Sequence, residues 1–465
     1  MEKNQVAVLD ITGVNSEGEG IARHGDDGYV VFVRGALPGE RVKGRIVRVQ
    51  KKFATAVTLD LVTASDVRKI PKCRHYGKCG GCQLQHASYG AQAAIKAKIL
   101  TDALRRIAKI ELPYQIDCTP SPEEWGYRNK TALPVQAGMG RGKSSLVCGY
   151  YEQGSHNIVP FRECPVLTPL LQKVVPSLIA ALDAANLKGY DEKGRSGDIR
   201  YIAARSGGSV RDEEALSCVV AAHDYSKREL GRLKNVHQKL GVAVPALSGS
   251  VLNINTDSGN FIWGPAFQSL NGKRQIEQRL AEYRFQTDIS AFFQVNRGQA
   301  ETMFSHVREC VREIGAQNVL ELYSGVGSLT AYLSGVVEQI DAVEEWRPAV
   351  RQMEENMTRN GARNVRVHPD AVERFLSQSE NTRSSTYDTV VLDPPRTGCP
   401  EAATDAIGRI APNHVVYVSC NPATLARDVA RLMEDGRYEI RGVRAFDMFP
   451  QTAHVETVAV LARRR

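Results

Sequence analysis

The pattern of hydrophobic and polar positions is clearest in the last third of the chain. From about residue 290 onward, short apolar runs alternate with segments whose apolar residues recur at helical spacing. The apolar runs predict strands at residues 318–322, 339–344, 365–368, 389–392, 415–419, 440–446 and 455–461. The segments between them predict helices at about residues 297–314, 327–335, 347–360, 371–377, 401–410 and 423–434. This alternation is typical of an open, doubly wound α/β sheet of the Rossmann-like kind.

The first 62 residues instead show short strands separated by Gly, Asn and Asp turns. Examples are residues 5–11, 28–33, 41–49 and 56–61, within a set of about five. Short strands joined by tight turns favour a small closed barrel of the oligonucleotide-binding type. The basic residues Arg41, Lys43 and Arg45 alternate with apolar or small ones, so they project from one face of a strand. That face is either a solvated surface or, on such a barrel, a contact surface for RNA.

The stretch between these regions holds a group of cysteines, a predicted helix at residues 89–107 and a mixed α+β pattern. Its predicted elements are strands at residues 149–151, 199–205, 215–222 and 250–255 and a helix at residues 170–185. A chain of 465 residues exceeds one compact domain. We therefore expect three domains, at residues 1–62, 63–285 and 286–465.

Composition and charge narrow the class of protein only moderately. A hydrophobic fraction of 42% and a charged fraction of 24% are those of an ordinary globular protein. No apolar run approaches the ~18 residues of a membrane span, and the N-terminus lacks the layout of a signal peptide. We therefore expect a cytoplasmic protein with no membrane partner. A net charge of +8 permits a nucleic-acid partner without requiring one.

Ten cysteines in a protein of that compartment argue against a disulfide framework. Three of them, Cys73, Cys79 and Cys82, fall within ten residues, which indicates a metal site. With Cys164 as a distant fourth donor, the spacing fits either a four-thiolate zinc site or a [4Fe–4S] cluster. His75 or His86 could complete a zinc site in place of the fourth cysteine.

Cys420 is the first candidate for catalysis. It follows the apolar run at residues 414–418, after Ser419, and precedes a helical segment that begins at Thr424. Ligands and catalytic groups in open α/β sheets lie at the carboxyl ends of strands. The Asn-Pro turn after Cys420 keeps the thiol at that edge. We therefore expect Cys420 to be a nucleophile.

The strand ends before Cys420 predict a cofactor crevice. Residues 323–328 contain a Gly-x-Gly turn where the backbone approaches a ligand closely, although Thr330 stands where a full dinucleotide fingerprint has its third glycine. Acidic residues follow the next strands at Glu344, Asp370 and Asp393. An acidic rim suits an adenosine ligand that carries a cationic centre better than a diphosphate. It favours S-adenosylmethionine over NAD.

A base for the reaction is predicted on the last strand. Glu456 enters a buried strand beside the edge that holds Cys420. A thiolate, a base and a methyl donor together suit methylation of C5 of uracil, which must first be activated by addition of the thiolate to C6. The target base must leave its stack to reach such a pocket.

Several of these motifs resemble the RNA uracil-C5 methyltransferases. The strings that carry the likeness are Asp-Pro-Pro-Arg at residues 393–396, Ser-Cys-Asn-Pro at 419–422, and Asp-Met-Phe-Pro with His-Val-Glu-Thr within 447–457. Residues 293–296 and 323–327 resemble the family's cofactor motifs. The resemblance implies Cys420 as nucleophile and Glu456 as base. Around the cofactor and the flipped base it implies Gln294, Tyr323, Ser328, Glu344, Asp370 and Asp393.

The N-terminal half fits the same family. The predicted barrel resembles a TRAM domain, and Cys73, Cys79, Cys82 and Cys164 are similar to the four-cysteine iron–sulfur site of some members. The resemblance favours a [4Fe–4S] cluster over zinc. Members with both features resemble the large-subunit ribosomal RNA enzymes, so the expected substrate is a uridine of 23S rRNA and the alternative is a uridine of tRNA. We expect a monomer.

Three other functions compete with this prediction. A radical methylthiotransferase has a Cys-x3-Cys-x2-Cys loop, whereas five residues separate Cys73 from Cys79 here. A silent RNA-binding or ribosome assembly factor would not need both Cys420 and Glu456. Amino-methylation of adenine usually has an aromatic residue after Asp-Pro-Pro, where this chain has Arg396. Cys399 is a rival nucleophile that we expect to lie in a surface turn.

Overall fold

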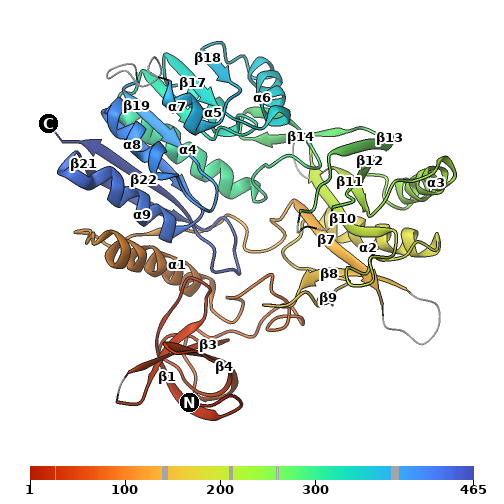
Figure 1. The fold of residues 1–465 in the computed structure, drawn as a ribbon, viewed down its shortest axis with the longest axis horizontal. Helices are drawn as coiled ribbons and strands as arrows, with labels where there is room; N and C mark the ends of the chain where they lie inside the picture. The colour runs from red at the N-terminus through yellow and green to blue at the C-terminus, as the bar shows by residue number, and fades with distance from the viewer. Residues whose placement is uncertain are drawn as a thin grey trace.

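The computed structural model describes the chain except for residues 27, 139–144, 209–212, 258, 260, 379–386 and 465. It has a small N-terminal barrel, a central sheet with two long helices, and a C-terminal sheet covered by helices (Figure 1). The helix α1 (Tyr89–Ala103) lies between the barrel and the C-terminal sheet (Figure 1). Among the described residues, no helix has both the length and the apolar character that a membrane span requires.

The N-terminal barrel is closed in the order β1-β2-β3-β5-β4. Its core consists of small and branched apolar side chains that alternate along the strands with exposed positions. Arg41, Lys43 and Arg45 all point outward from one strand, which confirms the predicted basic face. Arg41 pairs with Asp10 at 3.5 Å and Lys43 with Asp60 at 3.9 Å, so part of this charge is neutralised. The strands are β1 (Val6–Val14), β2 (Gly20–His24), β3 (Tyr29–Arg34), β4 (Arg41–Val49) and β5 (Phe53–Thr63).

The predicted helix at residues 89–107 is one α-helix with a different final turn. α1 ends at Ala103 and continues as a π-helical turn, η1 (Leu104–Ala108). Lys109 ends it in the left-handed conformation, with φ of 60°. The next strand, β6 (Cys118–Thr119), joins the C-terminal sheet rather than the central one.

The central sheet has the order β13-β12-β11-β10-β7-β8-β9 in the described residues. Helices α2 (Pro169–Ala184) and α3 (Lys227–Ala243) pack on it around a core of Leu and Val side chains. The sequence pattern predicted α2 but not α3, whose exposed face is rich in Lys, Arg and Gln. The strands are β7 (Lys130–Ala137), β8 (Leu146–Tyr151), β9 (Ile158–Pro160), β10 (Ile199–Gly207), β11 (Glu214–Ala221), β12 (Leu247–Ile254) and β13 (Ala266–Gly272). A separate hairpin, β14 (Gln275–Leu280) and β15 (Tyr283–Asp288), leads to the C-terminal sheet.

The C-terminal sheet has the order β18-β17-β16-β19-β20-β22-β21-β6. β16 to β20 are parallel, and most of their residues are buried, because helices cover both faces. β22 lies antiparallel between β20 and β21. The strands are β16 (Asn318–Leu322), β17 (Gln339–Val343), β18 (Val365–His368), β19 (Thr389–Leu392), β20 (His414–Ser419), β21 (Tyr438–Phe446) and β22 (Glu456–Arg463). The helices are α4 (Arg297–Glu313), α5 (Ser328–Ser334), α6 (Arg347–Arg359), α7 (Val372–Ser377), α8 (Glu401–Ile410), α9 (Pro422–Met433) and the 3₁₀ turn η2 (Glu434–Gly436). This arrangement confirms the predicted α/β fold.

Candidate active site

The predicted catalytic and cofactor residues gather at one edge of the C-terminal sheet. Strand order reverses between β16 and β19, which are neighbours although two strands separate them in the chain. Such a switch point leaves a crevice at the carboxyl ends of the strands. Tyr323 follows β16, Glu344 follows β17, Asp393 follows β19 and Cys420 follows β20.

Strand register brings Cys420 and Glu456 together. Ser419, the last residue of β20, pairs with Thr457 of the antiparallel β22. This is the last pair of the register, and Cys420 and Glu456 are the next residues beyond it. The Glu456 carboxylate lies close enough to the Cys420 thiol to raise its pKa, although the two residues are 36 positions apart in the chain.

The turn that carries Cys420 is fixed by side-chain hydrogen bonds. Asn421 is the N-cap residue of α9, and its side-chain oxygen accepts a hydrogen bond from Ala423 N at 3.0 Å. Asn421 Nδ2 donates to the Arg396 carbonyl oxygen at 3.0 Å. Ser419 Oγ accepts from Asn421 N at 3.1 Å. The Asp-Pro-Pro-Arg segment and the cysteine turn therefore form one unit, which keeps the half-buried thiol at the sheet edge.

The electrostatic environment makes the thiolate scarce at neutral pH. Burial, followed by the nearby Glu456 and Asp393 carboxylates, raises the pKa of the Cys420 thiol to about 11. The positive charge of Arg396 opposes that rise. Because the thiolate is the nucleophilic form, its formation depends on this cation and on protonation of the neighbouring carboxyls.

The two carboxyl groups beside Cys420 also have shifted pKa values. Burial, and then Asp393, raise the pKa of Glu456 well above its usual range, while Arg396 opposes the shift. Burial alone raises the pKa of Asp393 to about 6. A buried carboxyl with a raised pKa can accept a proton from a substrate at neutral pH. The site therefore contains a thiol and two buried carboxyl groups with raised pKa values.

The loop after β16 is shaped for a ligand. Tyr323, Gly325 and Gly327 all have positive φ, at 62°, 59° and 81°. A Cβ on Gly325 would meet no atom within 4 Å, so the space beside that backbone is open. A Cβ on Gly327 would lie 2.7 Å from Met353 Cγ, so this glycine allows α6 to pack closely.

Two buried polar atoms next to this loop lack partners among the described residues, namely Glu321 Oε2 and the Tyr323 hydroxyl oxygen. Burial raises the pKa of Glu321 to about 8. Thr330 lies beside the Glu321 carboxyl and Cys399 beside the Tyr323 hydroxyl, so both groups face protein atoms as well as the loop. These atoms, the open space at Gly325 and the acidic strand ends fit S-adenosylmethionine. Glu321 was not predicted from the sequence as a site residue. The signal that could have revealed it is an acidic residue within an otherwise apolar stretch of a predicted strand.

The remaining predicted cofactor residues lie in separate segments next to the strands of the C-terminal sheet. Glu344 accepts hydrogen bonds from Gly325 N at 3.0 Å and Trp346 N at 2.8 Å. Asp370 is paired with Arg374 of α7, and Ser328 is the first residue of α5. Gln294 is buried in the segment between β15 and α4. Their roles stay predictions.

Cys399 does not lie in a surface turn, and that expectation is wrong. It is only 2% exposed because Gly398, with φ of 74°, turns the chain into the core. Its backbone N donates to Asp428 Oδ2 at 2.8 Å, and the Tyr417 hydroxyl lies 3.7 Å from its sulfur. Burial raises the pKa of this thiol to about 12, so Cys399 is a poor rival to Cys420.

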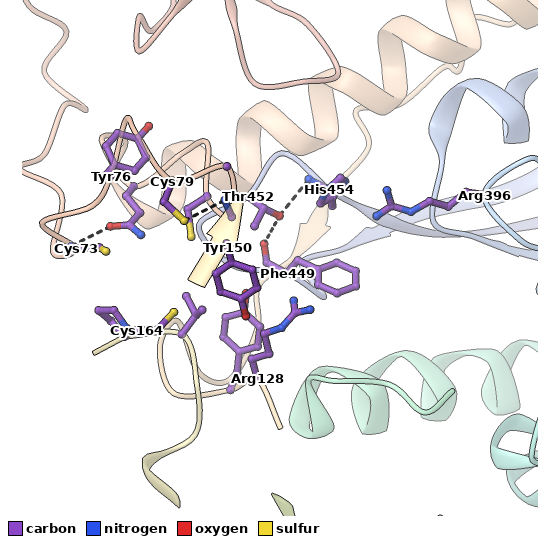
Figure 2. A pocket seen from close by; sticks show the side chains of 17 residues that line it. Cys73, Tyr76, Cys79, Arg128, Tyr150, Cys164, Arg396, Phe449, Thr452 and His454 are labelled. Atoms are coloured by element: carbon purple, nitrogen blue, oxygen red, sulfur yellow. Dashed lines mark hydrogen bonds between the residues drawn. The ribbon is translucent and has the colours of Figure 1, made fainter. Parts of the chain in front are cut away.

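The four predicted metal ligands, Cys73, Cys79, Cys82 and Cys164, line one cavity of about 270 Å³ (Figure 2). Neither His75 nor His86, the alternative ligands, is among the lining residues. However, no three Cys, His, Asp or Glu side chains of the described residues are close enough together to hold a metal ion. The metal cluster stays a prediction.

The chemistry of these residues fits a thiophilic metal or cluster. All four are free thiols. Burial raises the pKa of Cys82 to about 12 and that of Cys164 to about 11, and the other thiols of the group contribute to both shifts. Four thiolates in this cavity would need a cation to balance their charge.

The cysteine cavity extends to residues beside the candidate active site, which the sequence did not predict. Arg396, Phe449, Thr452 and His454 line its other side (Figure 2). Burial, and then the charge of Arg396, lower the pKa of His454 to about 4, so this imidazole is neutral. The cysteine site and the candidate active site thus share a wall.

Comparisons with known proteins agree with this geometry. Residues 267–464 match the family model "tRNA (Uracil-5-)-methyltransferase", and residues 2–59 match the TRAM domain. An uncharacterized RNA methyltransferase of Halalkalibacterium halodurans is 34% identical over 99% of this chain and 98% of its own length. One from Thermosynechococcus vestitus is 35% identical over 97% of each chain.

A solved structure shares the whole architecture. The Pyrococcus abyssi tRNA (uracil-54, C5)-methyltransferase, in complex with S-adenosyl-L-homocysteine, has a TM-score of 0.75 and 26% identity over 98% of this chain and 99% of its own. The fold and the crevice thus define a methyltransferase that uses S-adenosylmethionine and carries a TRAM domain. The chain belongs to the family of RNA uracil-5-methyltransferases. The predicted family and cofactor are confirmed, whereas the iron–sulfur site and the ribosomal substrate stay predictions.

Proposed function

We propose that the protein methylates C5 of a uridine in 23S rRNA, with Cys420 as nucleophile and Glu456 as base. The observation that carries this proposal is the strand register that ends at Ser419 and Thr457 and so brings Cys420 next to Glu456. S-adenosylmethionine supplies an electrophilic methyl group. We assign its binding, together with that of the flipped base, to Gln294, Tyr323, Ser328, Glu344, Asp370 and Asp393.

The chain's own residues then perform two steps. The Cys420 thiolate adds to C6 of uracil, and the electron pair that this addition releases makes C5 nucleophilic. After C5 has gained the methyl group, Glu456 removes the C5 proton, and the electron pair of that bond expels the thiolate. The raised pKa of the buried Glu456 suits it to accept this proton.

The choice of 23S rRNA rests on the pairing of a TRAM domain with the four cysteines. The alternative, a uridine of tRNA, is favoured by the likeness to the Pyrococcus abyssi enzyme. The test is methyl transfer to unmodified 23S rRNA and to unmodified tRNA, with nuclease digestion and mass spectrometry to map 5-methyluridine. We expect one modified region in 23S rRNA and none in tRNA. The reverse result would assign the enzyme to tRNA, and no product with either would contradict both.

We also propose that Cys73, Cys79, Cys82 and Cys164 hold a [4Fe–4S] cluster, with zinc as the alternative. The protein purified without oxygen should contain about four iron atoms per chain and no zinc, because four thiolates and four irons form that cluster. Elemental analysis and the visible absorbance measure this, and exposure to air should bleach the absorbance. The matched control is Cys148→Ser, since Cys148 is a buried thiol outside the cavity. One zinc per chain, or iron unchanged in Cys82→Ser, would contradict the cluster.

A further inference from the structure

The loop that leads into Glu456 is held from outside the catalytic domain. Phe446 at the end of β21 pairs with Glu456 at the start of β22, so residues 447–455 form the loop between the two strands. We call this segment the 447–455 loop. Its ends are fixed by the sheet, but its course is set by contacts with α1 and with the segment that follows Cys82.

Lys96 of α1 makes the most buried of these contacts. Its ammonium group forms an ion pair with Asp447, and both side chains are entirely buried. Lys96 Nζ also donates to the Phe449 carbonyl oxygen at 3.0 Å. A buried cation needs such partners, so the ion pair fixes the depth at which the loop lies.

Gln92, one helical turn before Lys96, holds the middle of the loop. Gln451 N donates to Gln92 Oε1 at 2.9 Å, and Gln92 Nε2 donates to Gln451 Oε1 at 3.0 Å. Gln451 has a positive φ of 73°, which a non-glycine residue adopts only when its surroundings impose it. The two hydrogen bonds from Gln92 supply part of that constraint.

The cysteine segment and the central region contribute further contacts. Gln83 N and Leu84 N donate to the Gln451 carbonyl oxygen at 3.1 and 2.9 Å. The Tyr127 hydroxyl donates to the Pro450 carbonyl oxygen at 2.9 Å. Three segments from the N-terminal half of the chain therefore bind the 447–455 loop, at Asp447 and at residues 449–451.

We propose that Gln92 and Lys96 are positioning residues that hold Glu456 in place for removal of the C5 proton. The inference rests on the proposed function, in which Glu456 is the base. Proton removal follows methyl transfer, so a displaced Glu456 slows resolution of the covalent enzyme–RNA adduct and leaves its formation intact. A purely structural role would lower stability without trapping the adduct.

Gln92→Met tests this because it keeps the length of the side chain and removes both hydrogen bonds to Gln451. With end-labelled RNA and S-adenosylmethionine, a denaturing gel should show the covalent adduct accumulating. Single-turnover release of methylated RNA should slow by roughly 10- to 100-fold, the effect of a small misplacement of a reacting group. The double variant Lys96→Met/Asp447→Asn, which leaves no buried unpaired charge, should behave in the same way.

A matched pair of tyrosines supplies the control. Tyr127→Phe removes a hydroxyl hydrogen bond of 2.9 Å to the Pro450 carbonyl oxygen. Tyr438 lies at the far end of β21, and Tyr438→Phe removes a hydroxyl hydrogen bond of the same length to the Pro412 carbonyl oxygen. Both side chains are buried. We expect similar losses in Tm for the two variants, and adduct only with Tyr127→Phe.

Any one of the following results would overturn the proposal. Gln92→Met could release product at the wild-type rate, Tyr438→Phe could accumulate adduct, or all variants could lose Tm equally without any adduct. Glu456→Gln is run beside them, because an absence of adduct there would show that the base itself is wrongly assigned. Adduct with Glu456→Gln but not with Gln92→Met would overturn the positioning role alone.

Discussion

Replacement of Cys420 by alanine should abolish methyl transfer to RNA. Alanine cannot add to C6 of uracil, and C5 without that addition is too weak a nucleophile to attack a sulfonium methyl group. We expect the single-turnover rate to fall by more than about 10⁴-fold, as when the nucleophile of other covalent enzymes is removed. RNA binding should persist, because the thiol is a small part of the contact surface. Filter binding and transfer of a labelled methyl group measure the two properties.

Cys310→Ala is the matched control for Cys420→Ala. Cys310 is also a partly buried free thiol, but it lies on α4 and packs near His306. This variant should methylate RNA at the wild-type rate. If Cys420→Ala retained substantial activity, the thiolate mechanism would be wrong, and so would the assignment of the catalytic edge.

The pH dependence of adduct formation follows from the same thiol. Because the pKa of this thiol is raised to about 11, only a small fraction is thiolate at neutral pH. As long as the pH stays below the pKa, that fraction increases about tenfold for each unit by which the pH is raised. Adduct formation should therefore become faster between pH 6 and pH 9. Removal of the Arg396 charge would raise this pKa further, so Arg396→Met should slow adduct formation at a given pH.

Replacement of Glu456 by glutamine should stop the reaction after methyl transfer. Glutamine has nearly the same shape but cannot accept the C5 proton, so the thiolate cannot be expelled. We expect turnover to fall by about 10²- to 10⁴-fold, the usual contribution of a general base, while a covalent RNA–protein adduct accumulates. A shift of labelled RNA on a denaturing gel, with mass spectrometry of the linked peptide, detects it.

Glu439→Gln is a suitable control for Glu456→Gln. Glu439 lies on β21 of the same sheet but forms only partly exposed ion pairs, with Arg441 at 3.0 Å and Arg464 at 3.6 Å. Its loss should leave turnover unchanged and trap no adduct. Rapid turnover by Glu456→Gln would mean that another group removes the proton. Asp393 would then be the next candidate, since it is the other carboxyl with a raised pKa beside Cys420.

The sequence predicted the catalytic edge because parallel strands leave local signals. Buried strands such as 415–419 are short apolar runs, and polar residues directly after them must lie at the same edge. The alternation of Arg41, Lys43 and Arg45 was likewise sufficient to predict an exposed basic face. These features depend on neighbours in the sequence.

The features that the sequence did not predict depend on distant contacts. Lys96 and Gln92 are unremarkable members of a helix until the 447–455 loop packs against them. The turn at Gly398 buries Cys399, although Gly and Pro beside a cysteine usually indicate a surface loop. The cavity that the cysteines and His454 line together is built from segments of three distant parts of the chain. None of these contacts produces a periodic pattern or a characteristic residue spacing in the sequence, so none could be predicted from it.

The contact between α1 and the 447–455 loop also determines when this part of the protein can fold during synthesis. The ribosome must add 351 residues after Lys96 before its partner Asp447 exists. At about 5–20 residues per second, that interval is on the order of 20–70 s. Throughout it, α1 and the cysteine segment lack the surface against which they pack in the finished protein. The segment that carries Asp447 and Glu456 therefore reaches α1 and the cysteine segment long after both have been made. The nascent chain cannot have the proposed activity before that segment has been synthesised.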